Sequence, residues 1–219
     1  MNRTINATKL DFYAGKSTLR LTFFLLLFAV VIGALSKGPI YTMIFTMVFA
    51  VTSSGTIFST HEKSHSDKLY GILPLKKSEM IIGRYLYALI IGAVYAVISG
   101  ILGFVMSRIM NASLDPFTFW ATLMLAFIYF SFAVGISYPI YLKFSFAKAY
   151  IFTMLPMYVI AVLILVLTKK TNFISNLGQV MRFFTDNQVL IPIFGILIGL
   201  ILLAVSALIA NLIYTRKEI

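Results

Sequence analysis

Residues 187–215 read NQVLIPIFGILIGLILLAVSALIANLIYT, a stretch that contains no Asp, Glu, Lys, Arg or His. About 20 apolar residues in a helix cross the hydrocarbon core of a bilayer, and an ionised side chain at its centre costs several kcal/mol. Only helices and closed barrels can span lipid, and this stretch lacks the polar and apolar alternation of barrel strands. The stretch therefore predicts a transmembrane helix.

The rest of the chain has the same character. Of its 219 residues 60% are hydrophobic and 11% are charged, whereas soluble domains average roughly 45–50% apolar and about 25% charged residues. We predict an all-α integral membrane protein with six transmembrane helices, forming one transmembrane domain over residues 1–219. The predicted spans are Leu21–Ser36, Gly38–Thr60, Tyr85–Ser107, Pro116–Leu142, Ala149–Thr168 and Asn187–Thr215. No cysteine is present, which excludes disulfides and thiolate metal sites.

The basic residues are distributed unevenly over the predicted connections. Thirteen of the 18 Lys and Arg fall before the first span, after the last, or in the second and fourth connections. The positive-inside rule therefore predicts that both termini are cytoplasmic. The net charge of +11 is explained by this sidedness, and no soluble segment is long enough to form a nucleic-acid-binding module.

Three segments outside the spans have helical patterns of their own. Residues 1–20 are predicted to hold an interfacial helix, and Thr8-Lys9-Leu10-Asp11 resembles a capping box at its start. Residues 61–84 are predicted to form a cytoplasmic loop that contains a short amphipathic helix, and residues 169–188 a helical loop on the outside. In the cytoplasmic loop Ser64 and Asp67 form a second capping box, which is followed by Leu69, Ile72 and Leu73 and is stopped by Pro74.

Small residues recur at four-residue spacing in two of the spans. Ala88, Gly92, Ala96 and Gly100 do so in the third span, and Gly195 and Gly199 form a G-x-x-x-G pair in the sixth. Such faces allow close approach of another helix. The partner helix belongs either to the same subunit or to a second one.

One motif suggests a catalytic metal. His61-Glu62-Lys63-Ser64-His65 matches H-E-x-x-H, which on a helix places two imidazoles on one face for zinc and a glutamate beside the bound water. Lys63 places a cation between the two ligands, and the sequence offers no evident third ligand. A zinc metalloprotease that uses His61, Glu62 and His65 is therefore kept only as an alternative.

The predicted spans contain no ionisable side chain except tyrosine, so the chain lacks buried groups that would couple movement to an ion gradient. Gly15-Lys16-Ser17 resembles the end of a phosphate-binding loop, but Leu10 stands where the loop requires glycine. We therefore expect no nucleotide or other cofactor on this chain. Any uphill transport would be driven by a partner that acts on residues 61–84.

Residues 58–86, FSTHEKSHSDKLYGILPLKKSEMIIGRYL, resemble the region between the second and third spans of ABC-2 type transporter permeases. The shared features are an acidic-basic pair, a short helix, a Leu-Pro step, basic residues and an acid that opens the next helix. The residues that carry these features, and that the resemblance assigns to an ATPase-coupling interface, are Glu62, Lys63, Asp67, Lys68, Leu69, Ile72, Leu73, Pro74, Lys76, Lys77 and Glu79.

The resemblance implies an ABC-2 fold in which two membrane subunits form a homodimer or heterodimer on two cytoplasmic ABC ATPase subunits. ATP and magnesium would be bound by the ATPases. This short chain is similar to the membrane subunits of bacterial exporters for amphipathic peptides such as phenol-soluble modulins. The resemblance implies a location in the bacterial plasma membrane. A membrane scaffold that binds a partner without transporting anything is the second alternative.

Overall fold

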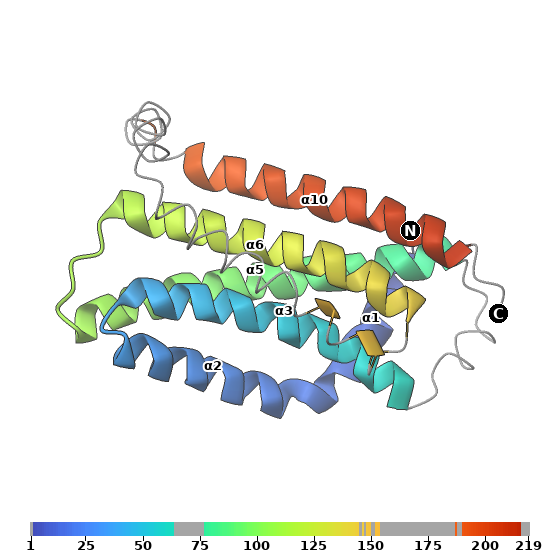
Figure 1. Cartoon of the computed structure of the whole chain (residues 1–219), viewed down its shortest axis with the longest axis horizontal. Coiled ribbons are helices and arrows are strands. Elements are labelled where there is room, and N and C mark those ends of the chain that lie inside the picture. Colours follow the sequence, from blue (N-terminus) through green and yellow to red (C-terminus); the bar gives the residue numbers. More distant parts are fainter. Residues whose placement is uncertain are drawn as a thin grey trace.

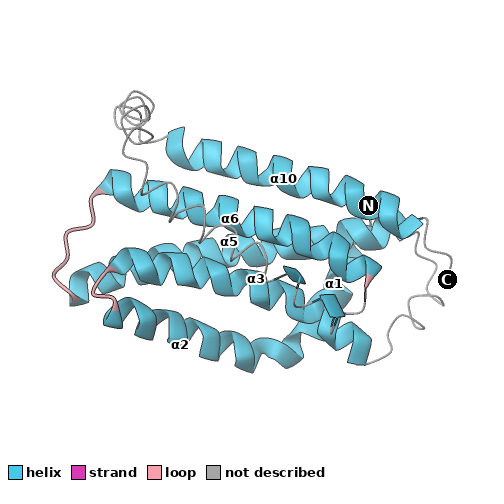
Figure 2. Ribbon diagram, viewed as in Figure 1, coloured by secondary structure: helices cyan, strands magenta, loops and turns pink. Residues whose placement is uncertain are grey.

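The protein is described from a computed structural model that covers residues 2–63, 77–144, 146, 148, 149, 152, 153, 187 and 190–215. All regular structure in these residues is helical (Figures 1 and 2). The elements are α1 (Asn2–Gly15), the 3-10 turn η1 (Lys16–Thr18), α2 (Leu19–Leu35), α3 (Pro39–Lys63), α5 (Lys77–Ile109), α6 (Pro116–Lys143) and α10 (Leu190–Thr215). The predicted all-α architecture is confirmed for this part of the chain.

Four of the described helices, α3, α5, α6 and α10, are long and apolar enough to cross a membrane. They coincide with the second, third, fourth and sixth predicted spans. The first predicted span is α2, whose 17 residues extend about 26 Å, and the axis bends by 73° between α1 and α2. The fifth predicted span, Ala149–Thr168, and the predicted helical loop 169–188 lie almost entirely outside the described residues.

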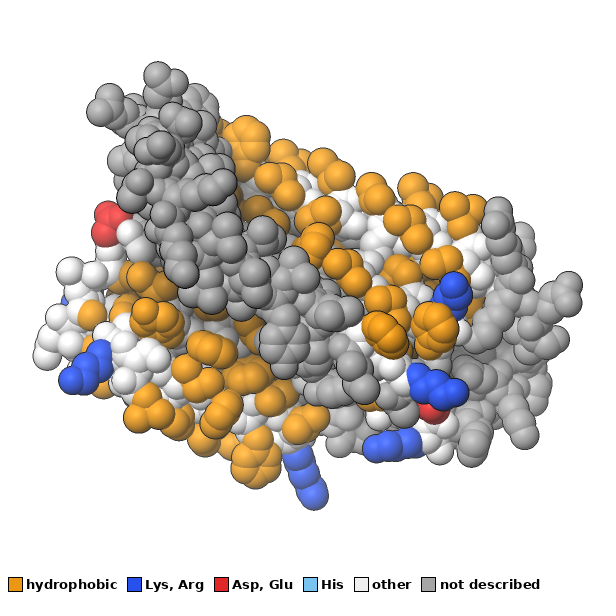
Figure 3. Space-filling view, viewed as in Figure 1, with side chains coloured by type: hydrophobic (Ala, Val, Ile, Leu, Met, Phe, Trp, Pro, Cys, Tyr) orange, Lys and Arg blue, Asp and Glu red, His pale blue; other side chains and the backbone are white. Residues whose placement is uncertain are grey.

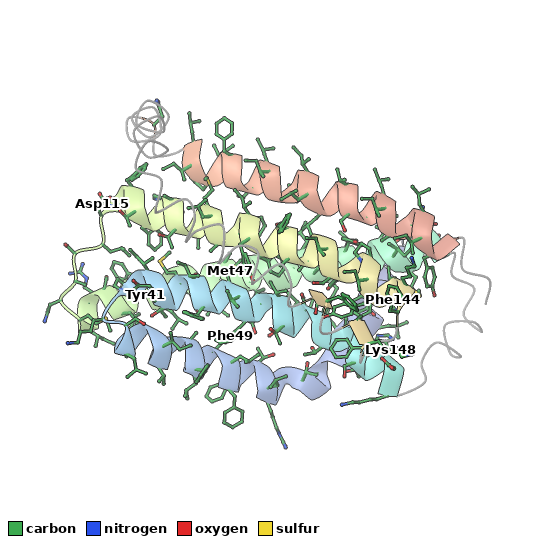
Figure 4. All side chains as sticks on the ribbon, in the orientation of Figure 1. Tyr41, Met47, Phe49, Asp115, Phe144 and Lys148 are labelled. Carbon is green, nitrogen blue, oxygen red and sulfur yellow. The ribbon has the colours of Figure 1, made fainter. Side chains whose placement is uncertain are left out.

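The long helices lie side by side in one bundle (Figure 1). Helices α2, α3, α6 and α10 follow one another across the view, and α5 lies behind α3 and α6. Figure 4 shows Tyr41 and Asp115 at one end of the bundle and Phe144 and Lys148 at the other. We call the second end the Asp11 end, because Asp11 of α1 is buried there. Helix α3 finishes and α5 begins at the Asp11 end, and α10 also ends there (Figure 1).

The predicted small-residue faces pack against helices of the same chain. A Cβ atom added to Gly92 would overlap the buried ring of Phe130, and one added to Gly199 would lie 2.6 Å from Phe127. Gly195 lies in the same way against Met124. The close approaches of α5 to α6 and of α10 to α6 therefore depend on these glycines. For these three positions the intramolecular alternative is confirmed.

Large apolar side chains are exposed on the outer surface of the bundle, and they cover much of the described part of the face shown in Figure 3. Val97 of α5 is 64% exposed and Leu208 of α10 is 67% exposed, while Phe24 of α2 is 66% exposed. Soluble proteins rarely expose contiguous apolar surface of this extent. These faces fit the hydrocarbon of a bilayer, so the chain is a multi-pass membrane protein.

The start of the N-terminal helix differs from the prediction. Helix α1 begins at Asn2, so Thr8 lies in its middle and the predicted capping box does not form. The capping box does not form because Thr8 and Asp11 have other partners. Thr8 Oγ1 lies 3.0 Å from the carbonyl oxygen of Thr4 and 3.1 Å from that of Gly83, and Asp11 is buried against α3.

Candidate functional site

The connection between α3 and α5 begins and ends at the Asp11 end of the bundle. It comprises residues 64–76, which lie outside the described part of the chain. Seven predicted coupling residues therefore lie outside the described part: Asp67, Lys68, Leu69, Ile72, Leu73, Pro74 and Lys76. The other four, Glu62, Lys63, Lys77 and Glu79, belong to the two helix ends that hold the connection.

At the α3 end, Glu62 and Lys63 are both exposed. The Oε2 atom of Glu62 accepts a hydrogen bond of 2.6 Å from the backbone N–H of Phe146, which follows α6. At the α5 end, Glu79 lies in the first helical turn, where a negative charge is stabilised by the helix dipole. Glu62 thus attaches the end of α3 to the backbone after α6, and Glu79 stabilises the start of α5.

A buried pair of polar side chains joins α1 to the end of α3. The Oδ1 atom of Asp11 lies 3.3 Å from Nε2 of His61, and the two side chains are 2% and 7% exposed. A buried carboxylate is tolerated only when it is paired or hydrogen-bonded. The pair therefore fixes the N-terminal helix to the residues directly before the connection.

A buried cation joins α3 to α5 one turn deeper. Arg84 is only 5% exposed, and its guanidinium carbon lies 4.9 Å from the centre of the Phe58 ring. Phe58 and His61 are three residues apart on α3 and share a face of the helix. The buried acid of α1 and the buried base of α5 therefore both pack on the same face at the end of α3.

Helix α1 also contacts the backbone of α5 directly. A Cβ atom added to Gly83 would lie 2.9 Å from the Cβ atom of Ala7 and 3.3 Å from the carbonyl oxygen of Thr4. No larger residue fits at Gly83 without moving α1. We call the assembly of α1, the end of α3 and the start of α5 the Asp11 junction; its central residues are Ala7, Asp11, Phe58, His61, Gly83 and Arg84.

Aromatic rings extend the Asp11 junction to α6. The Phe58 ring lies 4.9 Å from that of Tyr138 and 5.0 Å from that of Tyr141, and the Tyr141 ring stacks on Phe146 at 5.0 Å. Such ring pairs contribute about 0.5–1.5 kcal/mol each beyond the area that they bury. Movement of the end of α3 is thereby resisted by α6 as well as by α1 and α5.

Hydrogen bonds continue the network to α10. Ser206 donates to the carbonyl oxygen of Gly135 at 2.6 Å, so the hydroxyl of Tyr85 donates to Ser206 Oγ, also at 2.6 Å. Tyr138 donates to the carbonyl oxygen of Ser54 at 3.2 Å. Helices α3, α5, α6 and α10 are thus tied together close to the connection.

The zinc alternative finds little support in the described residues. The imidazole of His61 faces Asp11, and a carboxylate oxygen of Glu62 is engaged by the backbone of Phe146. His65 lies outside the described residues. Within the described ranges no three potential ligands among His, Cys, Asp and Glu come together.

Sequence reasoning missed the centre of this site. The sequence pattern places Arg84 at the end of the cytoplasmic loop 61–84 and Asp11 in a capping box, but both side chains are buried. One signal was present in α1, where Ala7, Asp11 and Gly15 repeat every four residues and form the buried face. An acid between two small residues on one helix face indicates close packing against a polar partner.

Comparison with known proteins gives one family. A family model described as an ABC-2 family transporter protein matches residues 8–215. The match includes α1 from Thr8 onwards, the connection 64–76 and all four candidate spans. Neither the curated proteins nor the solved structures gave a match.

Proposed function

Because the chain belongs to the ABC-2 family of transporter proteins, we propose that it is the permease subunit of an exporter whose energy comes from separate cytoplasmic ATPase subunits. The family match extends over residues 8–215 of a chain of 219 residues, and this match carries the proposal. A role as a transport permease follows from the family itself. The partner, the direction and the substrate are our inferences.

We propose that the ATPase subunits act on the permease through the connection 64–76. Leu69, Ile72 and Leu73 would insert into a groove of the ATPase, and the charged residues around them would set the orientation. Those charged residues are Glu62, Lys63, Asp67, Lys68, Lys76, Lys77 and Glu79. The helix would stop at Pro74, which cannot continue a hydrogen-bonded helix interior.

The Asp11 junction supports this proposal because it makes both ends of the connection rigid. Helices α3 and α5 have 25 and 33 residues and continue from the connection through the bundle. Arg84 on Phe58 joins the end of α3 to the start of α5, and Asp11 on His61 joins α1 to the end of α3. A push on the connection would therefore move the two helices and α1 as one body rather than bend a loop.

The distribution of basic residues supports a cytoplasmic location for the Asp11 end. Lys37 and Arg108 lie at the opposite end, whereas Lys9, Lys63 and Lys143 are among the cations near the Asp11 end. We propose that both termini face the cytoplasm of a bacterial cell and that the chain pairs with a second membrane subunit. The substrate is proposed to be hydrophobic or amphipathic, with amphipathic peptides as the first class to examine.

Replacing both Leu69 and Leu73 by Asp tests the coupling role. In proteoliposomes that contain the permease and its ATPase, we expect the double variant to lose ATP-dependent transport and most of its ATPase binding. The matched control is Leu114→Asp, which makes the same change in the connection between α5 and α6 at the opposite end. Normal assembly and normal transport by the double variant would refute the coupling role.

The partner is identified by affinity purification of the full-length chain from its native membrane in mild detergent. We expect an ABC ATPase to be recovered in a stoichiometric amount with the wild-type chain and to be depleted from the Leu69→Asp, Leu73→Asp preparation. Recovery of the same amount from both preparations would place the ATPase contact elsewhere.

A further inference from the structure

A groove of about 640 Å³ lies beside the Asp11 junction, between α1, α2, α3 and α5. None of the described residues that line it is one of the predicted ATPase-coupling residues. Its volume is within the range of about 300–1,000 Å³ that small-molecule sites occupy. Its two long walls are a face of α1 and a face of α5.

The wall from α1 is cationic and aromatic. Lys9, Phe12 and Tyr13 of α1 line the groove together with Lys16, the first residue of η1, and the four follow the spacing of a single helix face. Tyr13 is 76% exposed and Phe12 is 39% exposed. Ala7 and Asp11 lie on the opposite face of α1, which packs against α3 and α5.

The wall from α5 is apolar over most of its length. Ile91, Val94 and Ile98 line the groove, and Tyr87 closes its end by an edge contact of 4.9 Å with Phe12. Val94 is 48% exposed, and the exposed outer face of α5 continues beyond it through Val97. The apolar half of the groove is therefore continuous with the surface that faces lipid.

The charged side chains that line the groove are all positive among the described residues. Among the described residues that line it are two lysines and no acid. At its inner side the hydroxyls of Ser53 and Tyr95 are hydrogen-bonded to each other at 2.5 Å. A ligand that fits needs an anionic head for the lysines and an apolar tail for the wall of α5.

We propose that this groove binds an anionic phospholipid. The phosphate lies between Lys9 and Lys16, which are two helical turns apart, and one acyl chain follows Ile91, Val94 and Ile98. Lysine ammonium groups bind phosphate as point charges, and aromatic side chains are favoured at the level of the headgroups. A bound lipid would fill the wedge opened by the 73° bend between α1 and α2.

Native mass spectrometry of the full-length chain tests the proposal, with phosphatidylglycerol and phosphatidylethanolamine of identical acyl chains as probes. We expect phosphatidylglycerol to bind more tightly, and the double variant Lys9→Gln, Lys16→Gln to weaken it about 10- to 30-fold. The matched control is Lys37→Gln, Arg108→Gln, which removes two exposed charges at the opposite end and should leave binding unchanged. Equal affinity for the two lipids, or no effect of the Lys9 and Lys16 changes, would overturn the proposal.

The apolar half is tested by Val94→Trp, which fills the groove without changing its charge. We expect weaker binding of phosphatidylglycerol together with an unchanged thermal unfolding midpoint. Glycerol phosphate without acyl chains should fail to compete. Full competition by glycerol phosphate, with normal lipid binding by Val94→Trp, would show a site for phosphate alone and would contradict the proposal.

A second copy of the chain is the competing occupant. Because the native chain contains no cysteine, a single Val94→Cys variant reports on this position without background. We expect no disulfide-linked dimer after oxidation in membranes. Efficient cross-linking through Val94→Cys would show that a second subunit covers the groove, and lipid binding there would be refuted.

Discussion

The carboxylate of Asp11, near the end of the N-terminal helix, lies 3.3 Å from the imidazole of His61, fifty residues later in the chain. Both side chains are buried, and between them they connect α1 to the last turn of α3. This contact determines where the N-terminal helix lies, because it leaves one face of α1 against the bundle and the opposite face open to the groove.

Replacement of Asp11 by Ala is expected to lower the thermal unfolding midpoint and to raise amide hydrogen exchange in residues 2–15, because α1 loses its polar contact with α3. A double-mutant cycle with His61→Ala should give a coupling energy within about 0.5–3 kcal/mol, the range for directly contacting residues. Thermal unfolding in detergent and hydrogen exchange read by mass spectrometry measure the two effects. If the unfolding free-energy changes of the two substitutions were strictly additive, the contact would contribute nothing to stability.

Gly92 and Gly100 allow a matched test of helix packing, since they lie on the same face of α5. We expect Gly92→Ala to destabilise the protein by about 1–3 kcal/mol, because its new methyl group overlaps the Phe130 ring. Gly100→Ala meets only Phe119 at 3.4 Å, so it should be neutral or stabilising through its better helix propensity. Equal unfolding midpoints for the two variants would contradict the close approach of α5 and α6.

Ser206 should be the residue of α10 most sensitive to loss of a hydroxyl. Its replacement by Ala removes the bond to the Gly135 carbonyl and leaves the buried hydroxyl of Tyr85 without its acceptor. We expect a loss of about 1 kcal/mol, as for other hydrogen bonds between helices in membranes. Tyr85→Phe should reduce the effect of Ser206→Ala, whereas Ser113→Ala in an exposed connection should have none.

Asp115 gives a prediction for pH dependence. It caps α6, and hydrogen bonds from the backbone N–H and the hydroxyl of Thr118, both 2.9 Å, hold the pKa of its carboxyl below the ordinary value. A depressed pKa in the folded state means that the ionised form stabilises the fold. This contribution is complete above the unfolded pKa of about 3.9 and is lost as the pH falls through the folded value.

The variant Asp115→Asn keeps a capping side chain but cannot titrate in this range. We therefore expect the wild type to be the more stable protein at neutral pH and its advantage over Asp115→Asn to shrink as the pH is lowered below about 4. Thermal unfolding midpoints of both proteins across this pH range measure the difference. A difference that stays constant with pH would show that the cap does not titrate.

The spans were predictable because hydropathy is a local property. The uncharged stretches predicted as the second, third, fourth and sixth spans coincide with the long helices 39–63, 77–109, 116–143 and 190–215, and small residues such as Gly92 and Gly199 marked the faces where helices meet. The family was also predictable, since the pattern from Phe58 to Leu86 lies within one continuous stretch of sequence. The coupling role of Leu69 and Leu73 stays a prediction.

The sequence by itself determined that this chain is an all-helical membrane protein that has no cysteine and whose predicted spans hold no ionisable side chains other than tyrosine. Only the tertiary structure decided that Asp11 and Arg84 are buried, that Ser206 links three helices, and that Lys9 and Lys16 border a groove. The reason is that hydrophobicity acts on each segment separately, whereas burial of a polar side chain depends on its partner. The partners of Asp11, Arg84 and Ser206 lie on other helices, brought near by the packing of the whole bundle.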